Sequence, residues 1–213
     1  MIDNYVKFFF IALCFSIALC SYWFCRSKKD WAYLAAAMGF TMVSDYFLVL
    51  AHNYRAGVFV FCFVHIAYIL RVSGWAATGN HLEKSLSKIG AIICGGGLIF
   101  VVFAFVPALP WVDPLIVLAI VYASLFAQNF ADHIRYYRQG GPNRKIMLTG
   151  LILFILCDIH VMLFNLPNFL PVPPEIGLWG WRWIWVFYAP SQLLLSVSAV
   201  RWGEASTAPP ENN

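Results

Sequence analysis

Charged side chains are scarce in this chain: Asp, Glu, Lys and Arg make up only 11% of its 213 residues, whereas 62% are hydrophobic. An ordinary soluble domain is about one quarter charged. A soluble protein of this length can bury part of such an apolar surface, but not all of it. The composition therefore excludes an ordinary soluble domain and predicts an integral, multi-pass membrane protein, which we expect in a bacterial plasma membrane.

Several other features are absent. The six cysteines lie singly in apolar segments with no Cys-x-x-Cys pair, which excludes a zinc knuckle and a disulfide framework. No Gly-x-Ser-x-Gly nucleophile motif occurs. The last apolar segment contains no Lys, which excludes a retinal Schiff base. The net charge of +4 comes from Lys and Arg in the predicted connections, so it reports topology and does not indicate nucleic-acid binding.

Seven apolar segments are each long enough to cross a bilayer core about 30 Å thick, which takes about 20 helical residues. They are residues 5–25, 31–50, 56–73, 89–106, 114–131, 146–164 and 178–200. We expect one all-α transmembrane domain over residues 1–201 and a short disordered cytoplasmic tail over 202–213. Residues 165–180 contain four prolines and are expected to have little regular structure, and 78–88 are expected to form an amphipathic connection.

The distribution of Lys and Arg predicts the orientation of these spans. Three lie in 26–30, three in 71–88, four in 135–145, and Arg201 follows the last span, so eleven fall on one side. Only Lys7, Arg55 and Arg182 fall on the other. Because basic connections stay in the cytoplasm, the N-terminus is predicted outside and the C-terminus inside. Four Trp residues between 179 and 185 then lie at the outer interface, which is typical of an aromatic belt.

Three ionisable side chains fall well inside the predicted spans: Asp45, His65 and Asp158. His160 is a fourth, but it points to a different face of its helix from Asp158. Such residues are costly in a membrane and are functional candidates by default. With a rise of 1.5 Å per residue, both aspartates are predicted roughly 8–9 Å below the outer boundary of the core. Matching depth favours a shared cavity that opens toward the outer leaflet.

Polar residues on the same helix faces extend this candidate site. Thr41 lies one turn before Asp45, Tyr68 follows His65 by three residues, and Asn165 follows Asp158 by seven. Tyr188 lies at a similar depth in the seventh span, and Gln192 follows it by four residues. Each is a candidate for substrate binding, as is His65. The alternative is that these side chains, and the aspartates themselves, are hydrogen-bond ties between helices.

Two carboxyl groups in one dehydrated site fit general acid/base catalysis. A carboxyl group away from water can keep its proton at neutral pH and act as an acid, while a better hydrated one stays ionised and acts as a base. Flanked by Cys157 and aliphatic residues, Asp158 is expected to be the more desolvated. A zinc site built from the aspartates and histidines is the alternative, but the chain lacks an H-E-x-x-H or H-x-x-x-H motif, and we expect no metal and no cofactor.

Four segments of the chain resemble signatures of the lysoplasmalogenase (YhhN-like) membrane family. They are residues 39–48 (GFTMVSDYFL), 54–68 (YRAGVFVFCFVHIAY), 150–158 (GLILFILCD) and 188–194 (YAPSQLL). They occur in the family's order between residues 31 and 200. The family usually has eight spans, so the resemblance implies that the first is missing here, and His160 has no counterpart in the family pattern.

The resemblance implies hydrolysis of the vinyl ether bond of a lysoplasmalogen, giving a fatty aldehyde and a glycerophospho-base. Asp45 and Asp158 are then the expected proton donor and water-activating base, and a lysophospholipid and the membrane lipids are the expected partners, with no nucleic acid. A proton-coupled transporter or channel for a small or lipidic solute, with the aspartates as proton relays, is the alternative. A structural or scaffold protein is a third possibility.

Overall fold

The computed structural model describes residues 3–25, 27–75, 80–105, 113–137, 142–168 and 170–202. Within these ranges the chain is all-α, as predicted, and contains no β-strand. The seven helices are α1 (Asn4–Cys20), α2 (Lys28–Asp45), α3 (Tyr54–Ser73), α4 (His81–Phe105), α5 (Pro114–Tyr137), α6 (Pro142–Asn165) and α7 (Pro174–Ser196). Short 3₁₀ segments cover Ser21–Phe24 and Leu166–Asn168, and a π-helical segment covers Tyr46–Leu50.

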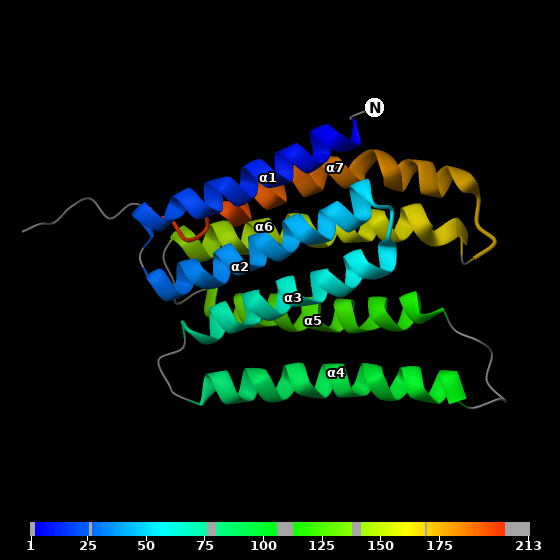
Figure 1. The fold of residues 1–213 in the computed structure, drawn as a ribbon, viewed down its shortest axis with the longest axis horizontal. Coiled ribbons are helices and arrows are strands. Elements are labelled where there is room, and N and C mark those ends of the chain that lie inside the picture. The colour runs from blue at the N-terminus through cyan, green and yellow to red at the C-terminus, as the bar shows by residue number, and fades with distance from the viewer. Residues whose placement is uncertain are drawn as a thin grey trace, which may run out of the picture.

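The helices run alternately in opposite directions and form an elongated bundle, with α1 and α7 along one side and α4 at the opposite edge beside α5 (Figure 1). Six of the described helices are long and apolar enough to span a membrane; α7 is the exception. Its 23 residues are sufficient in length, but Trp, Tyr, Glu175 and Arg182 lower its mean hydropathy. The chain is therefore a polytopic membrane protein with each predicted apolar segment in a helix.

Two predicted connections are shorter than expected. Residues 81–88 are the first turns of α4, so the expectation of a connection there is wrong: Ser85 bonds the Ser73 hydroxyl at 2.7 Å, and Ile89 is buried in a cluster with Ile69. The 165–180 region contains the 3₁₀ turn and the start of α7 at Pro174. Proline is favoured at the first position of a helix, because the missing N–H would have no partner there. The predicted tail beyond residue 202 lies outside the described residues.

The C-terminal ends of α1, α3, α5 and α7 and the N-terminal ends of α2, α4 and α6 lie at one end of the bundle (Figure 1). We call this the basic end, since it holds the described members of the larger basic group, Lys28, Lys29, Arg71, Lys84, Lys88, Arg135, Arg144, Lys145 and Arg201. Lys7, Arg55 and Arg182 belong to the opposite end. Two of the Trp residues expected in a belt there are exposed, Trp179 and Trp183, whereas Trp181 and Trp185 contact the Lys7 ammonium.

Membrane orientation gives a first prediction. Because Lys and Arg in short loops favour the cytoplasmic side, single cysteines placed in 26–30, 76–88 or 135–145 should react with an impermeant thiol reagent only from the cytoplasm. Cysteines in 165–180 should react only from outside. The native cysteines are replaced beforehand, and a cysteine in the N-terminal segment provides the matching control. Labelling of 165–180 from the cytoplasmic side alone would show that the protein has the opposite orientation in the membrane.

At the opposite end, α3 and α5 are connected by an exposed ion pair. The Arg55 guanidinium lies 3.3 Å from Asp113, which also accepts the main-chain N–H of Leu115 at 2.8 Å. The Leu115 N–H and the Arg55 charge together lower the pKa of Asp113 below its ordinary value. Asp113 therefore caps the N-terminus of α5 as a carboxylate, outside the apolar span.

The basic end is held together by a buried arginine. The Arg71 side chain is fully buried; its Nε and Nη2 donate to the two carboxylate oxygens of Asp30 at 2.9 and 2.8 Å, and its Nη1 donates to Ser198 Oγ at 2.7 Å. The indole N–H of Trp75 donates to the same carboxylate at 2.6 Å. One guanidinium thus connects α2, α3 and the segment that follows α7.

α6 and α7 pack closely against each other at Gly180. A Cβ atom added to Gly180 would lie 2.7 Å from the main-chain oxygen of His160 and 2.7 Å from the main-chain nitrogen of Phe164. Neither backbone atom can move without displacing α6. Gly180 therefore allows the two backbones to pack in contact, as small residues do between membrane helices.

This contact predicts that Gly180→Ala lowers stability by about 1–3 kcal/mol or more, because the added methyl group overpacks a backbone contact. Gly95→Ala is the matched control, since nothing lies within 4 Å of a Cβ at that exposed position of α4. The control should be neutral or slightly stabilising, as Ala is preferred over Gly in a helix. Thermal unfolding of both variants in detergent measures these changes. Equal unfolding midpoints for Gly180→Ala and Gly95→Ala would contradict the close approach of α6 and α7.

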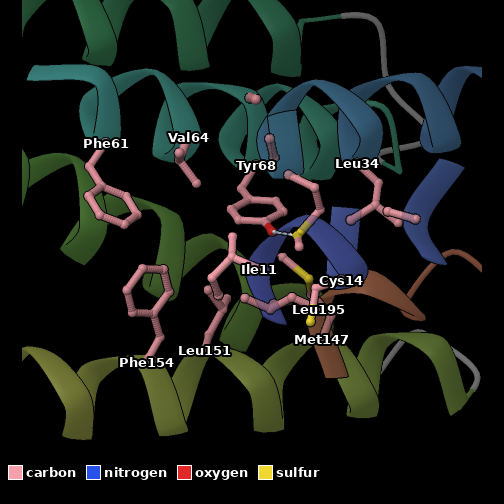
Figure 2. Close-up of a cluster of buried hydrophobic side chains, with 14 of the residues drawn as sticks. Ile11, Cys14, Leu34, Phe61, Val64, Tyr68, Met147, Leu151, Phe154 and Leu195 are labelled. Atoms are coloured by element: carbon pink, nitrogen blue, oxygen red, sulfur yellow. Dashed lines mark hydrogen bonds between the residues drawn. The ribbon is translucent and has the colours of Figure 1, made fainter. Parts of the chain in front are cut away.

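The apolar core between α3 and α6 contains facing aromatic rings. Phe61 and Phe154 point toward one another, with ring centroids 5.8 Å apart, and Tyr68 lies farther along the core with its hydroxyl toward Met38 (Figure 2). Ile11 and Cys14 of α1 and Leu195 of α7 close this core from the other side. At the Phe61–Phe154 part of the core, Phe61 also contacts Tyr122, and Phe154 contacts Tyr188.

Candidate functional site

Asp45 is the last residue of α2 and is 3% exposed. The Tyr188 hydroxyl of α7 donates to its Oδ2 at 2.5 Å, and Tyr188 is itself buried. The π-helical segment starts immediately after Asp45, where the main-chain N–H of Ala51 bonds the carbonyl of Tyr46. Such π-turns often occur at functional sites. The structure thus places one carboxyl group in the interior of the bundle with a tyrosine hydroxyl on it.

Asp158 lies in α6 and has an equivalent partner on a different helix. The Tyr122 hydroxyl of α5 donates to Asp158 Oδ2 at 2.6 Å. Both residues are partly exposed. Asp158 therefore has more exposed surface than Asp45, and which of the two is the more desolvated stays a prediction. The sequence neighbours of Asp158 are apolar, but Asp158 and Tyr122 keep some exposed surface where α5 packs against α6, whereas Asp45 and Tyr188 are buried.

The two Tyr–Asp pairs are connected through buried side chains of α6 and α3. The Cys157 thiol is 3% exposed and interacts electrostatically with both carboxyl groups. The Phe154 ring contacts the Tyr188 ring at 5.8 Å, while Phe61 contacts both Phe154 and Tyr122. The aspartates thus belong to one region of the interior, and a carboxyl separation within about 10 Å, the outer range for an acid/base pair that shares a water, stays a prediction.

His65 adjoins the Asp158 pair. It is 0% exposed, its ring stacks on Phe126 at 4.3 Å between centroids, and it contacts the Tyr122 ring edge-on at 5.0 Å. Its Nδ1 is hydrogen-bonded to Asn129 Nδ2 at 3.2 Å, and its Nε2 has no partner within the described part of the chain.

Gln192 lies one turn from Tyr188 along α7 and is 0% exposed. Neither its amide nitrogen nor its amide oxygen has a hydrogen-bond partner among the described protein atoms. An unpaired buried amide is costly, so the amide is available to a bound molecule.

Three other predicted site residues bond elsewhere in the described structure. Thr41 donates to the carbonyl of Ala37 within α2, and Asn165 donates to the carbonyl of Val161 within α6. The Tyr68 hydroxyl faces the Met38 sulfur at 3.6 Å. None of the three shows a hydrogen bond to either aspartate. His160, as expected, points away from Asp158, with its ring between Trp179 and Phe187 of α7.

In the part of the chain that the structure describes, no group of three or more His, Cys, Asp or Glu side chains is placed to hold a metal ion. A pocket of about 100 Å³ lies at the basic end between α3, α4 and α5, lined by residues that include Lys84, Lys88, Asp132 and Arg135. It is separated from Tyr122 by roughly 15 Å along α5, from the ten residues between Tyr122 and Asp132. This pocket is not part of the carboxyl site.

Sequence reasoning missed Tyr122 and Asn129, although both contact predicted site residues. The signal was present as a spacing: Tyr122, Asn129 and His133 recur at intervals of seven and four in the fifth span, which puts them on one helical face. The partners of that face depend on α5 lying beside both α3 and α6, and this arrangement follows from packing, not from local sequence.

Comparison with known proteins agrees with this arrangement at the level of the family. No curated protein and no solved structure matches the chain. The sequence profile of the YhhN family matches residues 3–199, which include all seven helices and both Tyr–Asp pairs. The chain belongs to the YhhN family.

Proposed function

We propose that this protein hydrolyses the vinyl ether bond of lysoplasmalogens, releasing a fatty aldehyde and a glycerophospho-base, through Asp45 and Asp158. The observation that carries the proposal is the pair of intramembrane carboxyl groups, each bonded to a tyrosine hydroxyl from a neighbouring helix. Membership of the YhhN family, which is associated with hydrolase activity, supports it.

The different surroundings of the two carboxyl groups support different roles. An ionised carboxylate is costly away from water, so Asp45, buried and bonded at Oδ2 by Tyr188, is suited to hold a proton on Oδ1. Asp158 is partly exposed and accepts the Tyr122 hydroxyl, which suits an ionised base. We therefore assign the proton donor to Asp45 and the water-activating base to Asp158.

The reaction then needs no cofactor. Asp45 donates its proton to the β-carbon of the vinyl ether, and the C=C bond becomes a C–H bond and an oxocarbenium ion. Asp158 takes a proton from water as the water oxygen bonds to the α-carbon. The resulting hemiacetal breaks its bond to the glycerol oxygen, giving the aldehyde and the free hydroxyl. The proton taken up by Asp158 balances the one given by Asp45.

The remaining predicted residues are proposed to bind the substrate. Gln192 has an unpaired amide one turn from Tyr188, suited to the glycerol or phosphate oxygens. His65, which lies beside Tyr122 and whose Nε2 has no partner among the described residues, is proposed to orient the water that reacts with the substrate. For Thr41, Tyr68 and Asn165 we propose a secondary role, since their present partners lie on their own helices or in the core.

Direct assay tests this proposal. Purified protein in lipid nanodiscs should release fatty aldehyde from a lysoplasmalogen. The matched control substrate is the saturated 1-alkyl lysophospholipid, which has the same head group and an ether oxygen but no C=C carbon to protonate, and it should give no product. Absence of aldehyde, combined with pH-gradient-dependent solute uptake in vesicles, would instead establish the transporter.

A further inference from the structure

A line of buried polar side chains runs between α3 and α5, away from the carboxyl groups. Asn129 Nδ2 is 3.2 Å from His65 Nδ1, and His133 Nδ1 is 2.9 Å from the main-chain oxygen of Asn129. His65 and Asn129 are 0% exposed and His133 is 2% exposed. We call these three residues the polar column.

Each member of the polar column has one hydrogen-bonding atom with no partner among the residues that the structure describes: His65 Nε2, Asn129 Oδ1 and His133 Nε2. The hydrogen bonds already made determine whether each of these three unpaired atoms is a donor or an acceptor. Asn129 Nδ2 donates to His65 Nδ1, so the proton of a neutral His65 is on Nε2, which is a donor. The carbonyl of Asn129 only accepts, so His133 Nδ1 carries the proton and its Nε2 is an acceptor.

One unpaired donor and two unpaired acceptors lie on adjacent turns of two packed helices. Buried polar groups are almost always paired, and those without a protein partner are typically paired with ordered water. Water suits this set because it can donate to Asn129 and His133 and accept from His65. An apolar or ionic ligand cannot satisfy all three atoms.

The column also points from the nearest bulk water to the proposed site. His133 is four residues from the end of α5 at Tyr137, roughly 6 Å, but nineteen residues from Pro114, about 29 Å. Its ring contacts Trp75 edge-on at 5.5 Å, and the Trp75 indole donates to Asp30 at the basic end. At the other extreme, the His65 ring contacts Tyr122, which bonds Asp158.

We propose that ordered water occupies the polar column and that the column conducts water from the basic end to Asp158. This inference rests on the proposed function for its role, because the hydrolysis consumes one water per turnover inside an apolar bundle. Lipid then reaches the carboxyl groups from the membrane, and water reaches them from the basic end. The two reactants enter by different routes.

The first test needs no activity. A high-resolution crystal structure of the full chain in a lipidic phase should show water density within hydrogen-bond distance of Asn129 Oδ1 and His133 Nε2. Density for these waters supports the column even if the protein releases no aldehyde, in which case only the proposed function fails. A dry interface, with these atoms paired to other protein groups, would overturn the column.

The second test addresses the role of the polar column in supplying water to the reaction. Asn129→Leu keeps the size of the side chain but removes both polar atoms, and should lower kcat for aldehyde release at least tenfold with little change in KM for lipid. Asn129→Ser leaves room for an additional water and should restore most of kcat, a pattern that a purely structural role does not produce. Ser124→Ala is the control, since that hydroxyl bonds only the carbonyl of Ile120 in its own helix. Unchanged kcat in Asn129→Leu would refute the water route.

Discussion

Replacing Asp45 or Asp158 by Asn should lower aldehyde release by about 10²–10⁴-fold, the usual contribution of a general acid or base. Asparagine keeps the size of the side chain, and its amide oxygen can still accept a hydrogen bond from the hydroxyl of Tyr188 or Tyr122. It cannot donate or take up a proton in the reaction. Both variants should remain folded, because a neutral amide costs less in a membrane than a carboxylate does.

Asp113→Asn is the matched control for these variants. Asp113 is a carboxylate with a cationic partner, but it lies at the end of α5 outside the apolar span. Its replacement should leave turnover unchanged. If the two intramembrane aspartates were only structural ties, activity would instead decline in proportion to stability. Normal turnover by a stably folded Asp158→Asn protein would rule out the two-carboxylate mechanism.

The second large effect is expected on stability. Arg71→Met should lower the free energy of unfolding by about 3–5 kcal/mol, because removing one partner of a buried pair leaves the other charge uncompensated. Here the loss includes two bonds to Asp30 and one to Ser198, all made by a fully buried guanidinium. Unfolding in mixed detergent micelles, followed by circular dichroism, measures the change.

A double-mutant cycle isolates the pair. Adding Asp30→Leu to Arg71→Met should recover part of the lost stability, since no unpaired charge then remains. The control is Arg55→Met, which removes the arginine of the exposed Arg55–Asp113 pair and should leave the unfolding midpoint nearly unchanged. Equal effects of Arg71→Met and Arg55→Met would show that the buried pair contributes no more than the exposed one.

The seven helices were predictable because each apolar segment is long enough to require a membrane helix and because Gly, Pro and basic residues separate them. The aspartates were predictable because an ionisable group inside a span is conspicuous. Tyr122 was not, since a tyrosine in an apolar segment has many possible roles. Its role depends on α5 contacting both α3 and α6, which is determined by packing of apolar faces with no unique sequence code.

The hydrogen-bond partners of individual side chains were a second feature that the sequence could not predict. Thr41 shares the Asp45 face by spacing, yet its hydroxyl bonds within its own helix. The exposed surface of the two aspartates could not be predicted either. Flanking residues describe only the chain on either side of a position, whereas exposure depends on how the neighbouring helices pack around it.

The π-helical segment after Asp45 has a consequence for insertions and deletions. In an α-helix one residue corresponds to a rotation of about 100°, so deleting a residue upstream, within 36–40, would turn Asp45 away from Tyr188. The Tyr46–Leu50 segment already contains a widened turn, closed by the bond from Ala51 to Tyr46. Deleting one residue there would let that turn tighten to ordinary α-helical spacing while Asp45 keeps its direction. Length variation in this span is therefore tolerated on one side of the carboxyl group and not on the other.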